Sequence, residues 1–216
     1  MLVYKYLPSQ YALQDLRDHQ MKISEFSDMN DPFELNGVSL SIPDILRVLI
    51  DDFKERVGAL CLCRNWTNPL LWSHYADKHK GICLGFEIAP DVELQQPEYV
   101  ARQQQSDARI LIKAVRTRET AEAAKVIAKM LLTKFEGWSY EDEVRLLVRQ
   151  KDRNGKYCYY KFGKRFQLCS VILGVRCVVE RSEIDKLLVS YPTTVRVFRT
   201  ALDFERFAIV EDTAWS

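Results

Sequence analysis

The chain lacks the glycine patterns that form the common phosphate-binding loops. It contains eight glycines, and none of them makes Gly-x-Gly-x-x-Gly or a P-loop. The standard dinucleotide and triphosphate loops are therefore excluded. An excess of charge of one sign is also missing, because the formal net charge is +1. That balance predicts no broad attraction to nucleic acid or to an acidic membrane, although it allows local charged patches.

Long apolar runs are absent too. No run approaches the ~20 residues that cross a bilayer. The N-terminal segment Met1–Tyr6 lacks the basic region and the apolar stretch of a signal peptide. We therefore expect no membrane partner and a cytoplasmic location. Five of the six cysteines lie in or beside apolar segments, which predicts free buried thiols rather than a disulfide framework.

The spacing of the possible metal ligands does not favour a metal site. Cys61-x-Cys63, His74, His79 and Cys83 lie close together in the sequence. However, Cys-x-Cys is not the usual Cys-x-x-Cys zinc knuckle, and the two histidines lack an accompanying glutamate motif. We expect no bound metal, and a nucleophilic Cys–His pair built from the same residues has no better support.

The residues that are present indicate a globular protein of class α+β. Apolar residues make up 47% of the chain and charged residues 28%, and 216 residues suffice for one core. We predict a single domain over residues 1–216, with mixed, mostly antiparallel sheets and flanking helices. Asn154-Gly155 indicates a hairpin turn. The main expected strands and helices are strands Leu2–Leu7, Ile110–Val115 and Glu143–Arg149, and helices Pro43–Gly58 and Arg118–Gly137.

The most informative stretch of the sequence is Trp138–Arg145. In a strand, successive side chains point to opposite faces, so Glu141, Glu143 and Arg145 would share one face. Two carboxylates and a guanidinium side by side are costly in a core and ordinary at the edge of a cleft. We therefore predict catalytic roles for Glu141, Glu143 and Arg145. The alternative is a solvated ladder of charges across neighbouring strands.

A second informative stretch is Trp72–Gly81. Trp72 and Tyr75 lie three residues apart, so they are neighbours on a helix and could line a cleft. Their alternative role is packing of the helix against the core. His79 precedes Gly81, and it is either a ligand contact or a residue favoured by the C-terminal end of a helix.

Two further segments could bind ligands. Asn30 and Asp31 could point from their loop toward a ligand, or could simply close a turn beside Phe33. The lysines and tyrosines that surround Asn154-Gly155, such as Lys161 and Lys164, could hold nucleic acid. Lysines at a strand edge also protect ordinary sheets from aggregation.

Four motifs together resemble a known family. Tyr4-Lys5-Tyr6, Phe26–Glu34, Trp72-x-x-Tyr75-Ala76-Asp77-x-His79-x-Gly81 and Trp138-x-Tyr140-Glu141-x-Glu143-x-Arg145 are similar to successive motifs of the domain-of-unknown-function family 2971 (DUF2971). The resemblance runs from residue 2 to about residue 150. The family name implies no activity.

The order of elements also resembles, more distantly, the ADP-ribosyltransferase fold. That resemblance implies a cleft between two small sheets that binds NAD. By position, Tyr4 or Tyr6 would hold the adenosine ribose or the nicotinamide amide. Trp72 or Tyr75 would orient the nicotinamide, and Glu143 would fix the nicotinamide ribose. Asn30, Asp31 and His79 complete the candidate nucleotide-binding residues.

These features lead to a hypothesis of NAD cleavage. Breaking the nicotinamide glycosidic bond builds positive charge on the ribose, and a carboxylate beneath the ring stabilises that charge in the transition state. The expected function is an ADP-ribosyltransferase or NAD glycohydrolase, with a nucleic acid or protein as a possible acceptor. By analogy, a toxin or phage-defence role would suit it. The alternative is a binding module for nucleotides or nucleic acid without turnover.

Overall fold

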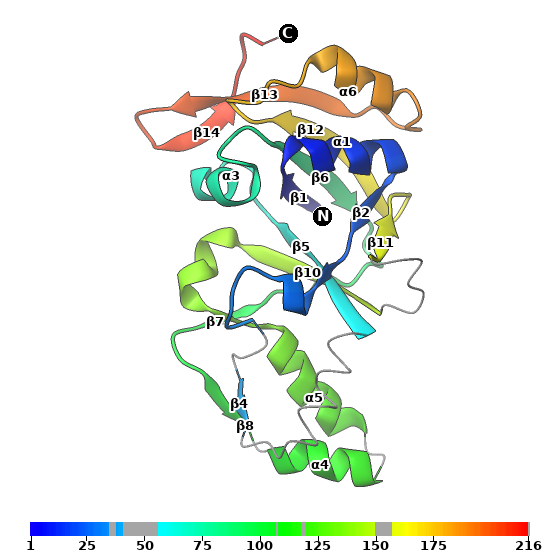
Figure 1. The fold of residues 1–216 in the computed structure, drawn as a ribbon, viewed down its shortest axis with the longest axis vertical. Coiled ribbons are helices and arrows are strands. Elements are labelled where there is room, and N and C mark those ends of the chain that lie inside the picture. The colour runs from blue at the N-terminus through cyan, green and yellow to red at the C-terminus, as the bar shows by residue number, and fades with distance from the viewer. Residues whose placement is uncertain (35–37, 41–55, 107, 118–119, 150–156, 216) are drawn as a thin grey trace.

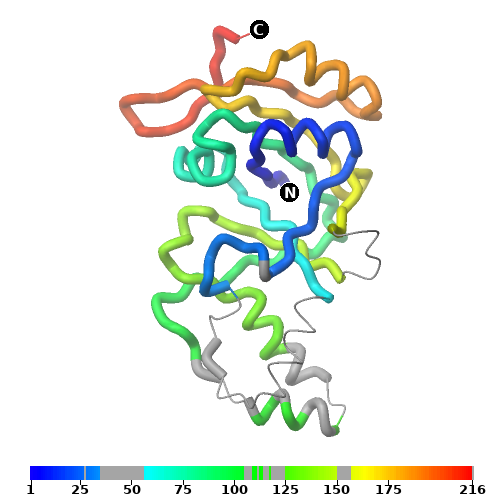
Figure 2. The backbone as a smooth tube through the Cα atoms, in the orientation of Figure 1, coloured from blue at the N-terminus to red at the C-terminus, as the bar shows by residue number. Residues whose placement is uncertain are grey.

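A computed structural model describes residues 1–34, 38–40, 56–106, 108–117, 120–149 and 157–215 (Figures 1 and 2). Its centre is an eight-stranded sheet in the order β10-β5-β1-β6-β12-β13-β14, with β3 paired to β5. Only β12 and β13 are parallel neighbours in this sheet. Its strands are β1 Leu2–Leu7, β3 Ser24–Glu25, β5 Val57–Cys63, β6 Ile82–Ile88, β10 Glu143–Arg149, β12 Phe166–Leu173, β13 Arg196–Asp203 and β14 Ala208–Glu211.

Apolar layers cover both faces of the sheet. Helices α1 (Ser9–Asp18) and α6 (Arg181–Leu188) contact each other and lie together in Figure 1. Their buried side chains, Leu16 and Ile184 among them, join Val3 in one core. Tyr4 points to the opposite face, as strand geometry requires, and packs in a second core with Trp72 of α3 (Pro69–Tyr75).

A pair of helices and several short strands extend the molecule on the side of the sheet away from α6, as Figure 1 shows. Helices α4 (Ala108–Thr117) and α5 (Thr120–Leu131) contact each other. Two short 3₁₀ helices, η1 (Phe26–Asp28) and η2 (Glu136–Glu141), lead into the cavity described below. The remaining strands form three two-stranded sheets: β2 Gln20–Lys22 with β11 Tyr159–Lys161, β4 Val38–Leu40 with β8 Gln104–Ser106, and β7 Glu98–Val100 with β9 Thr133–Phe135.

The central sheet is divided between β1 and β5. β1 pairs with β6 along its whole length, from Leu2 opposite Glu87 to Leu7 opposite Ile82. Toward β5, in contrast, it pairs only through Tyr4 opposite Cys63. Beyond that pair the strands diverge, so β3, β5 and β10 form one part of the sheet and β1, β6, β12, β13 and β14 the other.

The α+β class with a mostly antiparallel sheet is confirmed, and three details of the prediction were wrong. The expected strand Ile110–Val115 belongs to helix α4, because a short apolar run does not distinguish strand from helix and its Leu, Lys and Ala favour helix. The long helix ends at Leu131, where Thr133 Oγ1 donates to the carbonyl of Lys129 at 2.6 Å. β10 pairs with β5 and β11 with β2, so the predicted hairpin does not join them.

Some expectations remain without a test. Asn154-Gly155 and most of the predicted helix Pro43–Gly58 lie outside the described residues, although its Val57 belongs to β5. The single domain over residues 1–216 stays a prediction. All six cysteines are free, as expected.

Candidate functional site

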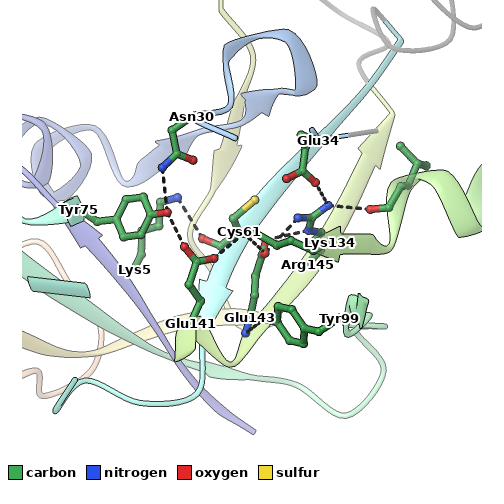
Figure 3. A network of polar contacts seen from close by, with 11 residues as sticks. Lys5, Asn30, Glu34, Cys61, Tyr75, Tyr99, Lys134, Glu141, Glu143 and Arg145 are labelled. Carbon is green, nitrogen blue, oxygen red and sulfur yellow. Dashed lines mark hydrogen bonds and ion pairs between the residues drawn. The ribbon is translucent and has the colours of Figure 1, made fainter. Parts of the chain in front are cut away.

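A cavity of about 300 Å³ lies where β1 and β5 diverge. Its walls come from β1, β5 and α3 and from the loop after η1. The strands β9 and β10 and the helix η2 contribute four of its charged residues, Lys134, Glu141, Glu143 and Arg145. Lys5 crosses the divide, because its Nζ donates to the carbonyl of Cys61 at 3.0 Å. Figure 3 shows the polar network on which the cavity is built.

Glu143 and Arg145 lie on one face of β10, and both line the cavity. They are buried, and Arg145 has no exposed surface. The guanidinium holds the carboxylate by two contacts, Nε to Oε1 at 2.8 Å and Nη2 to Oε2 at 3.0 Å. Arg145 Nη1 donates to the carbonyl of Leu131 at 2.7 Å. The predicted grouping on one strand face is therefore present for these two residues, in a buried place rather than as a solvated ladder.

Glu141 also lines the cavity, but it comes from η2 rather than from β10. It is the last residue of η2, not part of the strand, which corrects the predicted alternation. Asp142 then adopts a left-handed conformation with φ 43° and turns the chain into β10. Because of this turn, Glu141 and Glu143 both face the cavity.

Lys134 joins the two carboxylates. Its Nζ donates to Glu141 Oε2 at 2.5 Å and to Glu143 Oε2 at 2.7 Å. Two other residues complete the cluster. Glu34 forms an ion pair with Arg145 Nη1, and the hydroxyl of Tyr99 accepts a hydrogen bond from the backbone N–H of Glu143 at 3.0 Å. Three carboxylates and two cations thus share one buried region.

Tyr75 and Asn30 connect this cluster to the mouth of the cavity (Figure 3). The Tyr75 hydroxyl donates to Glu141 Oε1 at 2.5 Å and accepts from Asn30 Nδ2 at 3.1 Å. Burial raises the pKa of Tyr75, and the charge of Glu141 raises it further. Tyr75 therefore keeps its proton and serves as a donor to the carboxylate.

The charges in the cluster determine one another's ionisation. Burial alone would raise the pKa of Glu143, but Arg145 and Lys134 outweigh it and lower the pKa to about 2. Burial alone would lower the pKa of Lys134, but Glu143 and Glu141 raise it. For Glu34 burial prevails over Arg145, so its pKa is raised. Glu143 is thus a fixed anion near neutral pH, whereas Glu34 is the acid more readily protonated.

Residues 71–146 match the DUF2971 family model, whose description is "Protein of unknown function". The matched segment runs from α3 to β10 and contains Tyr75, Lys134, Glu141, Glu143 and Arg145. No curated protein and no solved structure matches the chain. Among the described residues, no helix has the length and apolar character needed to cross a membrane, and the cytoplasmic location stays a prediction.

The predicted nucleotide-binding residues divide into two groups. Tyr4, Tyr6, Asn30 and Tyr75 line the cavity together with the charged cluster. The ring of Tyr4 lies over Gly85, where an added Cβ would be 3.2 Å from it. Burial raises the pKa of Tyr4 to about 12, and nearby cysteines add to this effect, so its hydroxyl is neutral.

Trp72, His79 and Asp31 are not among the residues that line the cavity. Trp72 is fully buried, donates from Nε1 to the carbonyl of Trp66 at 2.7 Å, and packs edge-on against Tyr6 with ring centres 5.1 Å apart. His79 has φ 71° in a tight turn, and its carbonyl accepts from the N–H of Arg176. The packing of Trp72 agrees with its structural alternative and supports the position of Tyr6. Burial and the charge of Arg176 lower the pKa of His79, which disfavours the charged ring that the helix-end alternative assumes.

Sequence reasoning missed Lys134, Glu34 and Tyr99. Lys134 lies inside the expected long helix, and the signal against that helix is a lysine between Leu131 and Phe135, which interrupts the apolar stripe. Glu34 was part of a recognised motif, but only Asn30 and Asp31 were given roles. Nothing in the sequence marks Tyr99, which reaches Glu143 from β7 across the β7–β9 pairing.

Thiol and metal chemistry have little support at this site. Burial raises the pKa of Cys61 to about 12, and Glu143 adds to that effect, so the thiol stays protonated near neutral pH. Within the ranges that the structure describes, no group of His, Cys, Asp or Glu is arranged to hold a metal ion.

Proposed function

We propose that this protein is an enzyme that cleaves NAD at the bond between nicotinamide and ribose. One observation carries the proposal. Glu141 and Glu143 are buried, share the cation of Lys134 and line one cavity with the rings of Tyr6 and Tyr75. The division of the sheet between β1 and β5 also supports it, because the ADP-ribosyltransferase resemblance implies a cleft between two small sheets.

The net charge of the buried cluster favours a cationic ligand. The cluster carries one net negative charge when Glu34 is ionised and none when Glu34 is protonated. Nicotinamide is a pyridinium cation in NAD, and aromatic faces attract such rings. Lys5 and Lys22 also line the cavity and can bind the pyrophosphate, and the cavity volume lies at the lower end of small-molecule pockets.

In the reaction, the bond between C1′ of the ribose and N1 of the pyridinium breaks. Its electron pair goes to the ring, which leaves as neutral nicotinamide, and positive charge passes to the ribose. An acceptor oxygen or nitrogen then bonds to C1′ and loses a proton. Glu143 remains ionised throughout and stabilises the ribosyl cation. Arg145 and Lys134 hold it in place but offset part of its charge, so the stabilisation belongs to the cluster as a whole.

Glu141 is the candidate for orienting or deprotonating the acceptor. It receives hydrogen bonds from Tyr75 and Lys134, and it lies nearer the mouth of the cavity through its link to Asn30. Water as acceptor gives an NAD glycohydrolase, and a macromolecule gives an ADP-ribosyltransferase.

The second candidate is a nucleotide-binding module without turnover. It is favoured by the complete pairing of the cluster, since each oxygen of Glu141 and Glu143 already contacts a donor within the protein. A purely structural network would be satisfied in the same way.

Chromatographic measurement of nicotinamide release from NAD tests the proposal. We expect turnover by the wild type and a loss of about 10²–10³-fold in kcat for Glu143→Gln. Glu87→Gln changes an exposed glutamate of β6 and should retain activity. Tyr75→Phe, which removes one donor to Glu141, provides a gentler second variant. If the wild type releases no nicotinamide, the proposed enzymatic function is wrong. Binding of NAD without its cleavage would then favour the nucleotide-binding module.

A further inference from the structure

A second hollow, of about 350 Å³, lies on the surface beside the cavity. Rings from two segments form its walls, namely Phe33 from the loop after η1 and Phe135, Trp138 and Tyr140 from β9 and η2. Phe33 is 64% exposed and Phe135 is 48% exposed. Exposed aromatic rings grouped around a hollow are a common feature of binding sites for flat apolar groups.

Asp31 gives this hollow a polar group that lacks a partner. The residue lines the hollow and is only 5% exposed. Its Oδ1 accepts from the backbone N–H of Phe33 at 2.9 Å. Its Oδ2 is buried and has no hydrogen-bond partner among the residues that the structure describes. A buried acceptor without a donor is costly, so a ligand whose donor meets Oδ2 as the carboxylate turns toward the hollow would remove that cost.

Rings for stacking and one free carboxylate oxygen together define a type of ligand. It is planar and aromatic, and it carries an N–H group at its edge. We propose that the hollow binds a nucleobase with an exocyclic amine, such as adenine, and that the amine donates to Asp31 Oδ2. The rings contribute affinity for any base, and the carboxylate selects bases that have the amine.

The position of the hollow links it to the cavity. Asn30 faces the cavity, and the next residue, Asp31, faces the hollow. Lys134 Nζ, which bridges Glu141 and Glu143, lies 5.6 Å from the centre of the Trp138 ring. The base could therefore belong to NAD itself or to a second substrate. Only this choice of source rests on the proposed function, since the site stands on its own geometry.

Calorimetric titration with adenosine and inosine monophosphates tests the site without any catalysis. Inosine has a carbonyl in place of the amine, and its edge N–H lies one ring position away, at N1. An amine that meets Oδ2 directly is therefore replaced by an acceptor, so the wild type should bind inosine monophosphate about tenfold more weakly, as expected for loss of a hydrogen bond to a charged group. Asp31→Asn keeps an oxygen for the N–H of Phe33 and puts an NH₂ group in place of Oδ2. This variant should reverse the preference, because its NH₂ can donate to the inosine carbonyl.

Phe33→Ala tests the stacking. It should weaken both nucleotides by about tenfold or more, within the range for loss of one stacked ring, while their ratio stays the same. Phe204→Ala is the matched control, because Phe204 is 79% exposed at the turn between β13 and β14, and it should bind as the wild type does. Equal binding of the two nucleotides by the wild type, an unchanged ratio in Asp31→Asn, or no binding of adenosine monophosphate would overturn the site.

Kinetics then identify the source of the base. If it is the adenine of NAD, Asp31→Asn raises the KM for NAD and leaves cleavage of nicotinamide mononucleotide unchanged. If it is a second substrate, NAD cleavage is unaffected and adenosine monophosphate binds together with NAD. If the protein binds adenosine monophosphate but does not cleave NAD, the proposed function is wrong and the nucleobase site is retained.

Discussion

At the scale of single residues, the cluster depends on ionised carboxylates that are paired inside the protein. Glu143 has its pKa lowered from 4.5 to about 2 by Arg145 and Lys134, against the opposing effect of burial. A carboxyl whose pKa falls on folding stabilises the protein above its unfolded pKa. That contribution is lost as the pH falls from about 4.5 toward 2.

We predict that Glu143→Gln destabilises the protein at pH 7 by about 3 kcal/mol, which corresponds to the pKa shift of Glu143. The difference from the wild type should shrink steadily toward pH 2–3, because the protonated wild-type residue also leaves Arg145 and Lys134 without an anion. Urea unfolding at several pH values measures it. Glu87→Gln, which removes no buried ion pair, should show no such trend. A difference that is constant with pH would contradict the ionised state of Glu143.

A second prediction concerns Lys134. Lys134→Met leaves two buried carboxylates without their shared cation, so we expect a loss of about 3–5 kcal/mol in stability. Lys22→Met is the matched control at the same cavity, since Lys22 pairs with Asp28 at 3.6 Å with both side chains about half exposed. This change should cost at most about 1 kcal/mol. Equal melting temperatures for the two variants would mean that Lys134 is not a structural member of the cluster.

The sequence allowed part of this cluster to be predicted. Alternation in a strand was enough to bring Glu143 and Arg145 together, and the acidic motif included Glu141. Glu34 and Lys134 contact these residues from segments about 109 and 9 positions away from Glu143. Such contacts depend on how loops and short strands pack, and a local pattern does not contain that information.

At the scale of elements, short segments with a clear period were predicted well. Leu2–Leu7 and Glu143–Arg149 are strands over the residues expected, because alternation, bounded by proline or a turn, is a local signal. The wrong predictions concern segments whose structure depends on pairing with strands that are distant in the sequence. β9 forms only where β7 is available as a parallel neighbour, and β11 pairs with β2 rather than with the strand before it in the sequence.

The turn between α3 and β6 provides a prediction at this scale. A Cβ at Gly81 would lie 2.2 Å from the carbonyl oxygen of Leu7 and 2.8 Å from the Cα of Ala76. Both are backbone atoms that cannot move aside, so Gly81→Ala should lower stability by about 1–3 kcal/mol or more. Gly163→Ala, where no atom lies within 4 Å of the added Cβ, should be nearly neutral. Thermal unfolding of the two variants measures the contrast, and similar values would contradict the close backbone packing.

At the scale of the whole molecule, the two parts of the central sheet meet at one backbone pair, Tyr4 with Cys63. Lys5 adds a side-chain link from β1 to the carbonyl of Cys61 on β5. The cavity lies between the same strands and has walls from both parts. A ligand in it would therefore contact both parts and stabilise them together.

This arrangement predicts the response to a ligand that cannot be cleaved. An NAD analogue with a carbocyclic ribose cannot form the ribosyl cation, so it should bind and remain. At a concentration of 100 times its Kd it should add about 2.7 kcal/mol, which raises the melting temperature of a chain of this size by about 5–10 °C. Hydrogen exchange should slow in β1 and in β5 alike, because the ligand bridges the strands where backbone pairing is missing. Nicotinamide alone, which is too small to span both walls, is the control and should protect them less. Protection of β1 without β5 would place the ligand outside the divide and contradict the position of the site.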